Sequence, residues 1–371
     1  MAHAGDGCPA DGRESGTWSG GLKMQRRRRA QWGWLILILL LLACDRKEPV
    51  VSWGPSPDLP GRARVEPSAV LPAGSVSRRP ITLGFSQLGT ESDWRNANSE
   101  SVKEAAAEAG IELLFENAEQ SQEKQFEAIR SFVEKKVDVI AIAPVIETGW
   151  EPILREVKQA GIPVIMVDRE MKISDPSLYV TFIGSDFYEE GRKAGKYLRD
   201  ALRDEIGPIG IAELKGTEGS SPTIERAKGF RDIIRERSDF RIILSEHANF
   251  TVKEGKRVME KFLREKGREI RVLFAHNDDM ALGAVEAIKE YGLRPGKDIL
   301  IISVDGSRKA LEKLAAGEIN FVVECNPLIG PQIMQAVQEI MEGRSLPKRI
   351  VSSETVFTQT SAARELPNRR Y

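Results

Sequence analysis

Polar and charged side chains follow several short apolar runs of the sequence, at the points where these runs end. They are Gln87, Glu91, Trp94 and Arg95 after the run 81–85, Asp168 and Arg169 after 164–167, Arg226 beyond 209–214, Asn277 after 271–275, Asp305 after 299–304, and Asn326 after 321–325. A carboxylate accepts hydrogen bonds from two adjacent hydroxyl groups, and a guanidinium fork donates two. A tryptophan ring covers an apolar C–H face and excludes water from it. These residue types therefore predict a binding site for a small polyhydroxylated ligand.

The apolar runs alternate with segments of helical periodicity, which predicts repeated strand–helix–strand units. Strands are expected at 81–85, 111–115, 137–145, 164–167, 180–183, 209–214, 241–245, 271–275, 299–304 and 321–325, with a final extended piece at 350–358. Helices are expected at 92–109, 122–135, 149–160, 187–203, 223–236, 252–265, 279–291, 307–316 and 329–342. The strands are too many for one sheet of usual size, so we predict an α/β fold with two doubly wound parallel-sheet lobes. The alternative is a (β/α)₈ barrel, which expects eight units in a single domain.

Open α/β sheets bind ligands at the carboxyl ends of their strands, which is where the polar residues fall. Six of these residues also have a purely structural interpretation, and in Asn277 the two roles can coexist. The structural alternatives are helix capping for Asn277, turn formation for Asp305, a surface ion pair for Asp168 with Arg169, a solvated helix position for Arg226 and a core position for Trp94.

The composition argues against several other classes of protein. The chain has 371 residues, with 54 basic against 55 acidic side chains, so no overall basic excess points to nucleic acid. Three Cys cannot make a disulfide framework, and three His leave little room for a His-rich metal site. The sequence contains no Walker A loop, dinucleotide-binding glycine pattern, zinc-protease motif or nucleophile elbow. We therefore expect neither an enzyme nor a bound cofactor or metal.

The N-terminal region has the pattern of a secretory signal. Arg26–Arg29 form a basic block, residues 32–43 form an apolar run shorter than the ~20 residues that span a bilayer, and Leu41-Leu42-Ala43-Cys44 resembles a bacterial lipobox. We predict a lipoprotein signal peptide at 24–44 that begins at Met24, with lipidation at Cys44 and a misassigned extension at 1–23. A Pro-rich tether follows at 45–79. The alternative is an ordinary signal peptide in which Cys44 is incidental.

Several motifs, in order and at consistent spacing, extend from residue 80 to about residue 365. They are Gly84-Phe85-Ser86-Gln87, Glu91-Ser92-Asp93-Trp94-Arg95, Ile142-Ala143-Pro144, Val167-Asp168-Arg169, His276-Asn277-Asp278-Asp279-Met280 and Val304-Asp305-Gly306. Through them the chain resembles periplasmic substrate-binding proteins of the ribose/galactose class, which serve ABC sugar importers. Within that class, the stretch 91–95 and the segments Thr148-Gly149-Trp150-Glu151-Pro152 and Pro295-Gly296-Lys297-Asp298-Ile299-Leu300 resemble the galactofuranose-binding members.

The resemblance implies two α/β lobes joined by a three-strand hinge that closes on a monosaccharide. The first lobe would hold 80–184 and about 326–350, and the second 185–325 and about 351–371. The resemblance also implies ligand contacts for Trp94, Arg95, Asp168, Arg169, Arg226, Asn277 and Asp305, with Glu91 and Gln87 as additions. Glu324-Cys325-Asn326 replaces a family glutamine, so the residue that faces the ligand there stays open. Trp94 and Arg95 also stand where the ribose-binding members stack Phe on their sugar, which disfavours ribose.

The sequence thus predicts a monomeric lipoprotein, periplasmic or at the cell surface, that delivers galactofuranose or a related sugar to an ABC permease and its ATPase. The alternative is a sugar sensor that presents its ligand state to a membrane kinase or chemoreceptor, and neighbouring genes would separate the two. A sugar-responsive repressor would carry a helix-turn-helix where this chain has a signal and a tether. A glycan-processing enzyme would hydrolyse the bound sugar.

Overall fold

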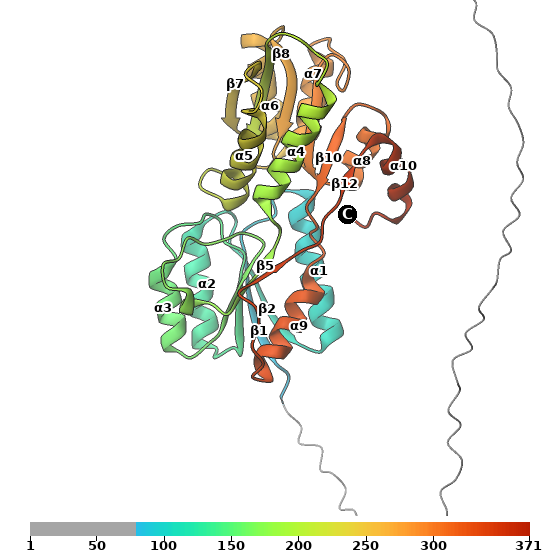
Figure 1. Ribbon diagram of the computed structural model, residues 1–371. Helices are drawn as coiled ribbons and strands as arrows, with labels where there is room; N and C mark the ends of the chain where they lie inside the picture. The colour runs from blue at the N-terminus through green and yellow to red at the C-terminus, as the bar shows by residue number, and fades with distance from the viewer. Residues whose placement is uncertain (1–78) are drawn as a thin grey trace, which may run out of the picture. The chain divides into compact units, whose positions relative to one another are not determined.

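The computed structural model describes residues 79–371, in which two six-stranded sheets are flanked by helices (Figure 1). The predicted lipoprotein signal, Cys44 and nearly all of the predicted tether lie outside the described residues. The first sheet has the order β11 (Arg349–Val351), β5 (Thr181–Gly184), β4 (Val164–Val167), β3 (Val139–Ile142), β1 (Thr82–Gln87) and β2 (Glu112–Asn117), and all of its pairs are parallel.

Alternate residues of the first sheet pack against helices on its two faces. Val139 and Ala141 share one core with α1 (Asp93–Ala109) and α9 (Gly330–Met341), whereas Ile140 and Ile142 share another with α2 (Gln122–Glu134) and α3 (Glu151–Gln159). Figure 1 shows these two pairs of helices on opposite sides of the sheet. The strands are apolar throughout because both faces are covered.

The second sheet repeats this arrangement. Its order is β12 (Val356–Phe357), β10 (Phe321–Glu324), β9 (Leu300–Asp305), β8 (Ile270–Ala275), β6 (Ile209–Lys215) and β7 (Phe240–His247), and only β12 is antiparallel to its neighbour. One face packs on α4 (Phe187–Ala201) and α5 (Ser221–Ile234), and the other on α6 (Val252–Lys266), α7 (Asp278–Glu290) and α8 (Arg308–Ala315). The prediction of two doubly wound α/β lobes is confirmed.

The chain passes between the two sheets three times, at 185–186, 325–329 and 352–355. The third passage corrects an expectation, because the single extended piece at 350–358 is two short strands in different sheets. The expected strand 137–145 is also shorter and comprises only Val139–Ile142. The helix α10 (Gln359–Glu365) was not expected, although the capping box of Thr358 with Ser361 marks its start.

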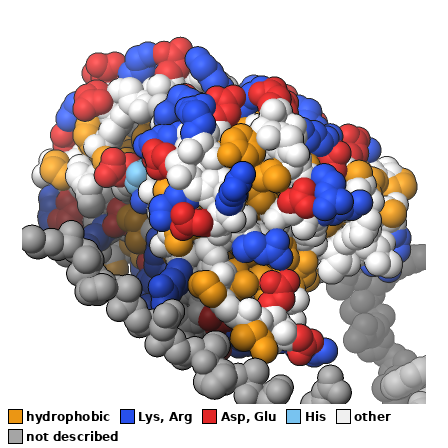
Figure 2. Space-filling view, turned by 90° about the horizontal axis from the view of Figure 1, so that it is seen from above, with side chains coloured by type: hydrophobic (Ala, Val, Ile, Leu, Met, Phe, Trp, Pro, Cys, Tyr) orange, Lys and Arg blue, Asp and Glu red, His pale blue; other side chains and the backbone are white. Residues whose placement is uncertain are grey.

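No helix within residues 79–371 is long and apolar enough to cross a membrane. The surface of this region mixes charges of both signs. Figure 2 shows Lys and Arg side chains interspersed with Asp and Glu on the face seen from above, which agrees with the near balance of acidic and basic residues in the sequence.

Two glycines allow α4 and α5 to touch through their backbones. A Cβ atom on Gly191 would lie 2.2 Å from the carbonyl oxygen of Arg226, and one on Gly229 would lie 2.0 Å from the carbonyl oxygen of Tyr188. Real Cβ atoms do not approach oxygen so closely, so any side chain at either position would push the helices apart. The contact sets the position of Arg226 on α5.

We predict that Gly191→Ala lowers the free energy of unfolding by about 1–3 kcal/mol, because the added methyl group overpacks the contact between α4 and α5. Urea denaturation measures the change. Lys196→Ala, on the partly exposed side of α4, is the control and is expected to change stability by no more than about 0.5 kcal/mol. Equal stability of Gly191→Ala and wild type would contradict this account of the contact.

Candidate functional site

A polar pocket of about 300 Å³ lies between the two lobes. The predicted residues that line it are Glu91, Trp94, Arg95, Asp168, Arg169, Arg226, Asn277 and Asp305. All of these residues except Glu91 expose no more than 5% of their surface, so they are almost completely buried. The volume includes open solvent at the mouth of the pocket, and buried polar side chains that converge in this way are typical of a small-molecule site.

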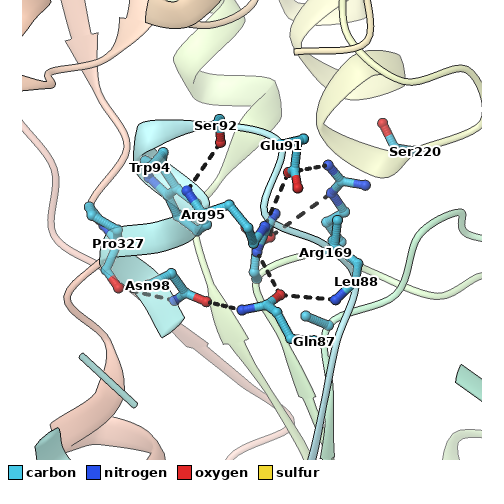
Figure 3. A network of polar contacts seen from close by, with 12 residues as sticks. Gln87, Leu88, Glu91, Ser92, Trp94, Arg95, Asn98, Arg169, Ser220 and Pro327 are labelled. Carbon is cyan, nitrogen blue, oxygen red and sulfur yellow. Dashed lines mark hydrogen bonds and ion pairs between the residues drawn. The ribbon is translucent and has the colours of Figure 1, made fainter. Parts of the chain in front are cut away.

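On the first-lobe side, Arg95 is held by carboxylates (Figure 3). Its Nη2 donates to Oδ2 of Asp168 at 2.7 Å, and its Nε donates to Oε1 of Glu91 at 3.2 Å. Ser92 caps the start of α1 by accepting from the backbone N–H of Arg95, which fixes the first turn of that helix. Each carboxylate keeps lone pairs that a ligand hydroxyl can use.

Arg169 completes this side of the pocket and has a free donor. Its Nη1 donates to the carbonyl oxygen of Val145 at 2.9 Å, and its Nη2 lies 3.7 Å from Oε1 of Glu91. Its buried Nε has no hydrogen-bond partner among the described residues. Burial, aided by the positive charge of Arg95, lowers the pKa of Arg169 to about 10, so the group is still charged at neutral pH. An oxygen atom of a ligand would satisfy the free N–H.

The second-lobe side is built around Arg226. Its Nε donates to Oε2 of Glu190 at 2.6 Å, its Nη1 donates to the carbonyl oxygen of His276 at 2.6 Å, and its Nη2 lies 3.8 Å from Oδ1 of Asp305. Burial raises the pKa of Asp305 well above its usual range, although Arg226 opposes the rise. The structure thus buries Arg226 in a network of contacts and does not leave it solvated.

The two strand-end aspartates share an unusual backbone conformation. Asp168, directly after β4, has a φ of 61°, and Asp305, at the end of β9, has a φ of 126°. Residues other than glycine rarely adopt such angles, and the strain clusters at functional sites. β4 and β9 occupy the same place in their two sheets, so each lobe presents one strained aspartate to the pocket.

Three further predicted residues differ in their placement. Asn277 lines the pocket and also caps α7, since its Oδ1 accepts from the N–H of Met280 at 3.0 Å. Gln87 lies behind the lining, where its Oε1 accepts from Nη1 of Arg95 at 3.3 Å. Asn326 is also outside the lining, and its Oδ1 accepts from the N–H of Leu328 at 2.9 Å. Cys325 is the member of its triplet that lines the pocket.

Sequence reasoning missed four residues of the lining, Ser92, Phe187, Pro222 and Phe250, and it left Cys325 open as one of three candidates. Phe250 lies in the loop after β7, and its ring centroid is 5.3 Å from the guanidinium carbon of Arg169 in the other lobe. Its position after a strand was a usable signal. Trp94 makes the reverse connection, because it packs in the core of the second lobe and its Nε1 donates to the carbonyl oxygen of Cys325 at 2.7 Å.

One group of side chains within residues 79–371 has oxygen and sulfur atoms close enough to share a metal ion. The atoms of Glu190, Cys325 and Glu354 lie within 4.8 Å of one another. Burial raises the pKa of Glu354 to about 8, and the charge of Glu190 adds to the rise. Arg226 already neutralises Glu190. At neutral pH we therefore expect a proton on Glu354, which gives the otherwise unpartnered Oε1 of Glu190 a donor, and no metal.

The raised pKa of Glu354 predicts a pH-dependent stability. Between its ordinary value of 4.5 and about 8, the folded state holds a proton that the unfolded state has lost, so stability falls as pH rises through this range. Glu354→Gln cannot ionise and is expected to gain stability relative to wild type between pH 5 and pH 8. Thermal melts across this range test it, with Glu312→Gln on α8 as the exposed control. Parallel pH profiles for Glu354→Gln and wild type would contradict the prediction.

Comparisons with known proteins agree with this geometry. The periplasmic binding protein domain matches residues 83–345. The galactofuranose-binding protein YtfQ of Escherichia coli (strain K12) is 40% identical over 294 residues, which cover 78% of this chain and 92% of that protein. A Mycobacterium smegmatis protein in complex with β-D-fucofuranose is 48% identical, with a TM-score of 0.77 over 78% of this chain and 95% of that one.

Two further solved structures differ in the systems that they serve. The binding-protein component of the arabinose ABC transporter from Shewanella sp. ANA-3, bound to α- and β-L-arabinofuranose, is 47% identical, with a TM-score of 0.76 over 78% of this chain and 96% of that one. The fructose-binding periplasmic domain of a hybrid two-component system is 28% identical, with a TM-score of 0.71 over 78% of this chain and 94% of that one.

These relatives are substrate-binding proteins, so the prediction that the chain is not an enzyme is confirmed. The predicted resemblance to the ribose/galactose class, with galactofuranose-binding members among its relatives, is confirmed as well. On its domain match, its identity to known members and its two α/β lobes, the chain belongs to the periplasmic binding protein family.

Proposed function

We propose that this protein captures a monosaccharide in its furanose form between the two lobes and delivers it to an ABC permease. The observation that carries the proposal is the pocket between the lobes, to which each lobe contributes at least one buried arginine and a strained strand-end aspartate. Carboxylates and guanidinium groups are the partners that vicinal hydroxyls need. The ligand would replace water as the partner of groups such as Nε of Arg169.

Aromatic side chains make the apolar part of the proposed site. Trp94, Phe187 and Phe250 all line the pocket and come from both lobes. They would cover the C–H faces of a sugar ring while the charged groups hold its hydroxyls. The ligand-binding residues that we propose are Glu91, Trp94, Arg95, Asp168, Arg169, Arg226, Asn277 and Asp305. Gln87 would act indirectly through Arg95, and Asn326 stays outside the proposed contact set.

The relatives support a particular group of sugars. Galactofuranose, β-D-fucofuranose and L-arabinofuranose appear in their names and complexes. D-galactose, D-fucose and L-arabinose share one configuration at C2, C3 and C4 and differ only beyond C4. We therefore propose that the charged pocket reads the hydroxyls at C2 and C3 of the furanose ring.

Calorimetric titration of residues 79–371 tests this proposal. D-galactose, D-fucose and L-arabinose are expected to bind. D-ribose is expected to bind at least about tenfold more weakly, because its inverted C3 hydroxyl leaves a buried polar group unpaired. D-glucose matches at C2 and C3 and is expected to bind more weakly because its inverted C4 places the exocyclic chain on the other face of the furanose ring. NMR with sugar labelled with ¹³C at C1 then identifies the bound ring form. No binding to any of the five sugars, or a bound pyranose, would sink the proposal.

Asp168→Asn tests the role of the strand-end carboxylate. Asparagine tolerates a positive φ nearly as well as aspartate, so the variant removes charge while it keeps the backbone. We expect the affinity for the best sugar to fall about tenfold to a hundredfold, which is the size of a hydrogen bond to a charged group. Asp200→Asn, a mostly exposed site on α4, is the matched control. Equal affinity of Asp168→Asn and wild type would remove Asp168 from the site.

A lipid anchor at Cys44 is part of the proposal, with the protein held at the outer face of a membrane, in the periplasm or at the cell surface. Its support is the lipobox-like sequence before Cys44 and the Pro-rich segment that follows. Cys44→Ser in the full chain is expected to move the protein from the membrane fraction to the soluble fraction. Membrane retention of Cys44→Ser would argue for an uncleaved signal instead of a lipid.

The second candidate function is sensing. A relative that is the periplasmic domain of a hybrid two-component system favours it, because the same fold serves signalling there. Sugar-dependent stimulation of a permease ATPase in reconstituted membranes would favour transport, and sugar-dependent phosphorylation of a membrane kinase would favour sensing.

A further inference from the structure

The last three residues fold back against the turn that carries Asp305. Figure 1 shows the C-terminal end beside α8 and α10. Arg369 donates from Nε to the carbonyl oxygen of Gly306 at 2.5 Å and from Nη2 to that of Asp305 at 3.4 Å. The hydroxyl of Tyr371 donates to the same oxygen of Asp305 at 3.4 Å.

This turn is strained and needs support. Asp305 has a φ of 126° and Gly306 a φ of 88°, so two successive residues lie in a region that L side chains rarely adopt. On the side away from the tail, Oδ2 of Asp278 accepts from the N–H groups of Gly306 at 2.8 Å and Ser307 at 2.6 Å. The amides of the turn are therefore held by Asp278, and its carbonyls by Arg369 and Tyr371.

Arg369 is itself fixed in place. Its Nη1 donates to Oε1 of Glu324 at 2.8 Å, and both side chains are only 12% exposed. Its guanidinium carbon lies 4.2 Å from the ring centroid of Tyr371 and 4.9 Å from that of Phe357. The backbone N–H of Arg308 donates to the carbonyl oxygen of Tyr371 at 2.6 Å, which closes the tail onto α8.

The packing leaves no slack between the tail and the turn. A Cβ atom on Gly306 would lie 2.6 Å from Nη2 of Arg369 and 2.7 Å from the ring of Phe357. A displacement of Arg369 would therefore break the hydrogen bonds to the carbonyl groups of Asp305 and Gly306 and remove the packing that confines the turn. Asp305 is the residue of this turn that lines the pocket, 3.8 Å from Arg226.

We propose that Arg369 and Tyr371 are positioning residues for ligand binding, which hold the Asp305–Gly306 turn so that the Asp305 carboxyl group points into the pocket. The inference rests on the proposed function, because it assigns the tail to the same sugar site. Neither residue lines the pocket, so both act through Asp305.

The test is a double-mutant cycle on sugar affinity. Arg369→Ala alone is expected to weaken binding of the best sugar about tenfold, because it removes the charge-assisted bonds to the turn. Tyr371→Phe is expected to weaken binding about twofold, because it removes one long bond to the turn and the acceptor that the hydroxyl offers to Nη2 of Arg369. Asp305→Asn removes the carboxyl group that the tail positions. In the Asp305→Asn background, Arg369→Ala is expected to have no further effect, because the residue it acts through no longer has that carboxyl group.

A merely structural role gives a different result. If the tail only stabilises the second lobe, Arg369→Ala lowers the melting temperature but leaves affinity unchanged well below it, or lowers affinity equally in both backgrounds. Either result overturns the inference. Arg364→Ala is the matched control and should change neither quantity, because this arginine on α10 is 79% exposed and pairs with Glu365 alone among residues 79–371.

Failure of the inference and failure of the proposed function are distinguishable in the same experiment. If wild type binds none of the sugars, the proposed function falls and this inference falls with it. If wild type binds a sugar and Arg369→Ala binds it equally well, only the inference falls. If Arg369→Ala does not fold, Tyr371→Phe replaces it in the double-mutant cycle with Asp305→Asn, because this variant removes only one hydroxyl group from a half-buried ring.

Discussion

The desolvation of charge is the constraint on which the rest of this structure depends. Arg95, Arg169 and Arg226 are almost completely buried, and a buried charge is tolerated only where opposite charge and hydrogen bonds surround it. Each lobe supplies these partners from its own residues. Asp168 and Glu91 pair with Arg95 in the first lobe, and Glu190 and Asp305 lie next to Arg226 in the second.

The contacts that join the lobes at the pocket are of another kind. Trp94 bonds to a backbone carbonyl of the other lobe, and Arg169 lies over Phe250. The buried arginines of the pocket thus pair within a lobe, whereas the ion pairs Lys309–Asp93 and Arg370–Glu104, which cross between the lobes, lie among more exposed side chains.

That each lobe contributes its own set of polar side chains to the pocket follows from parallel-sheet topology. The carboxyl ends of the strands collect polar side chains at one edge of each sheet, and the two edges meet at the pocket. The aspartate at the equivalent strand in each lobe has a strained backbone, which turns its carboxyl group toward the pocket. Strain of this kind persists only where the surroundings fix it, and the contacts of Asp278 and the C-terminal tail with the Asp305 turn provide such surroundings.

The three passages of the chain between the sheets meet close behind the pocket. Ser185, Cys325 and Glu354 come from the first, second and third passage, and Ser185 contacts both of the others. Glu190 connects this group to Arg226, whose helix is set by the glycine contacts between α4 and α5. The residues that link the lobes and the residues that line the pocket are thus parts of one buried network.

The sequence by itself determined the features that depend on local patterns. Apolar runs and helical periodicity predicted nearly every strand and helix and the two doubly wound lobes. A strand that is covered by helices on both faces is apolar along its whole length, so each strand shows this burial in its own short sequence. The strand-end rule also brought together eight of the predicted site residues.

Tertiary structure decided which way each strand-end side chain turns. Gln87 ends its strand like the others but turns to Asn98, Ser99 and Arg95, and Asn326 turns to its own loop. Phe187, Phe250 and Cys325 enter the pocket only because the second lobe lies against the first, and contacts between residues far apart in the chain leave no periodic signal in it.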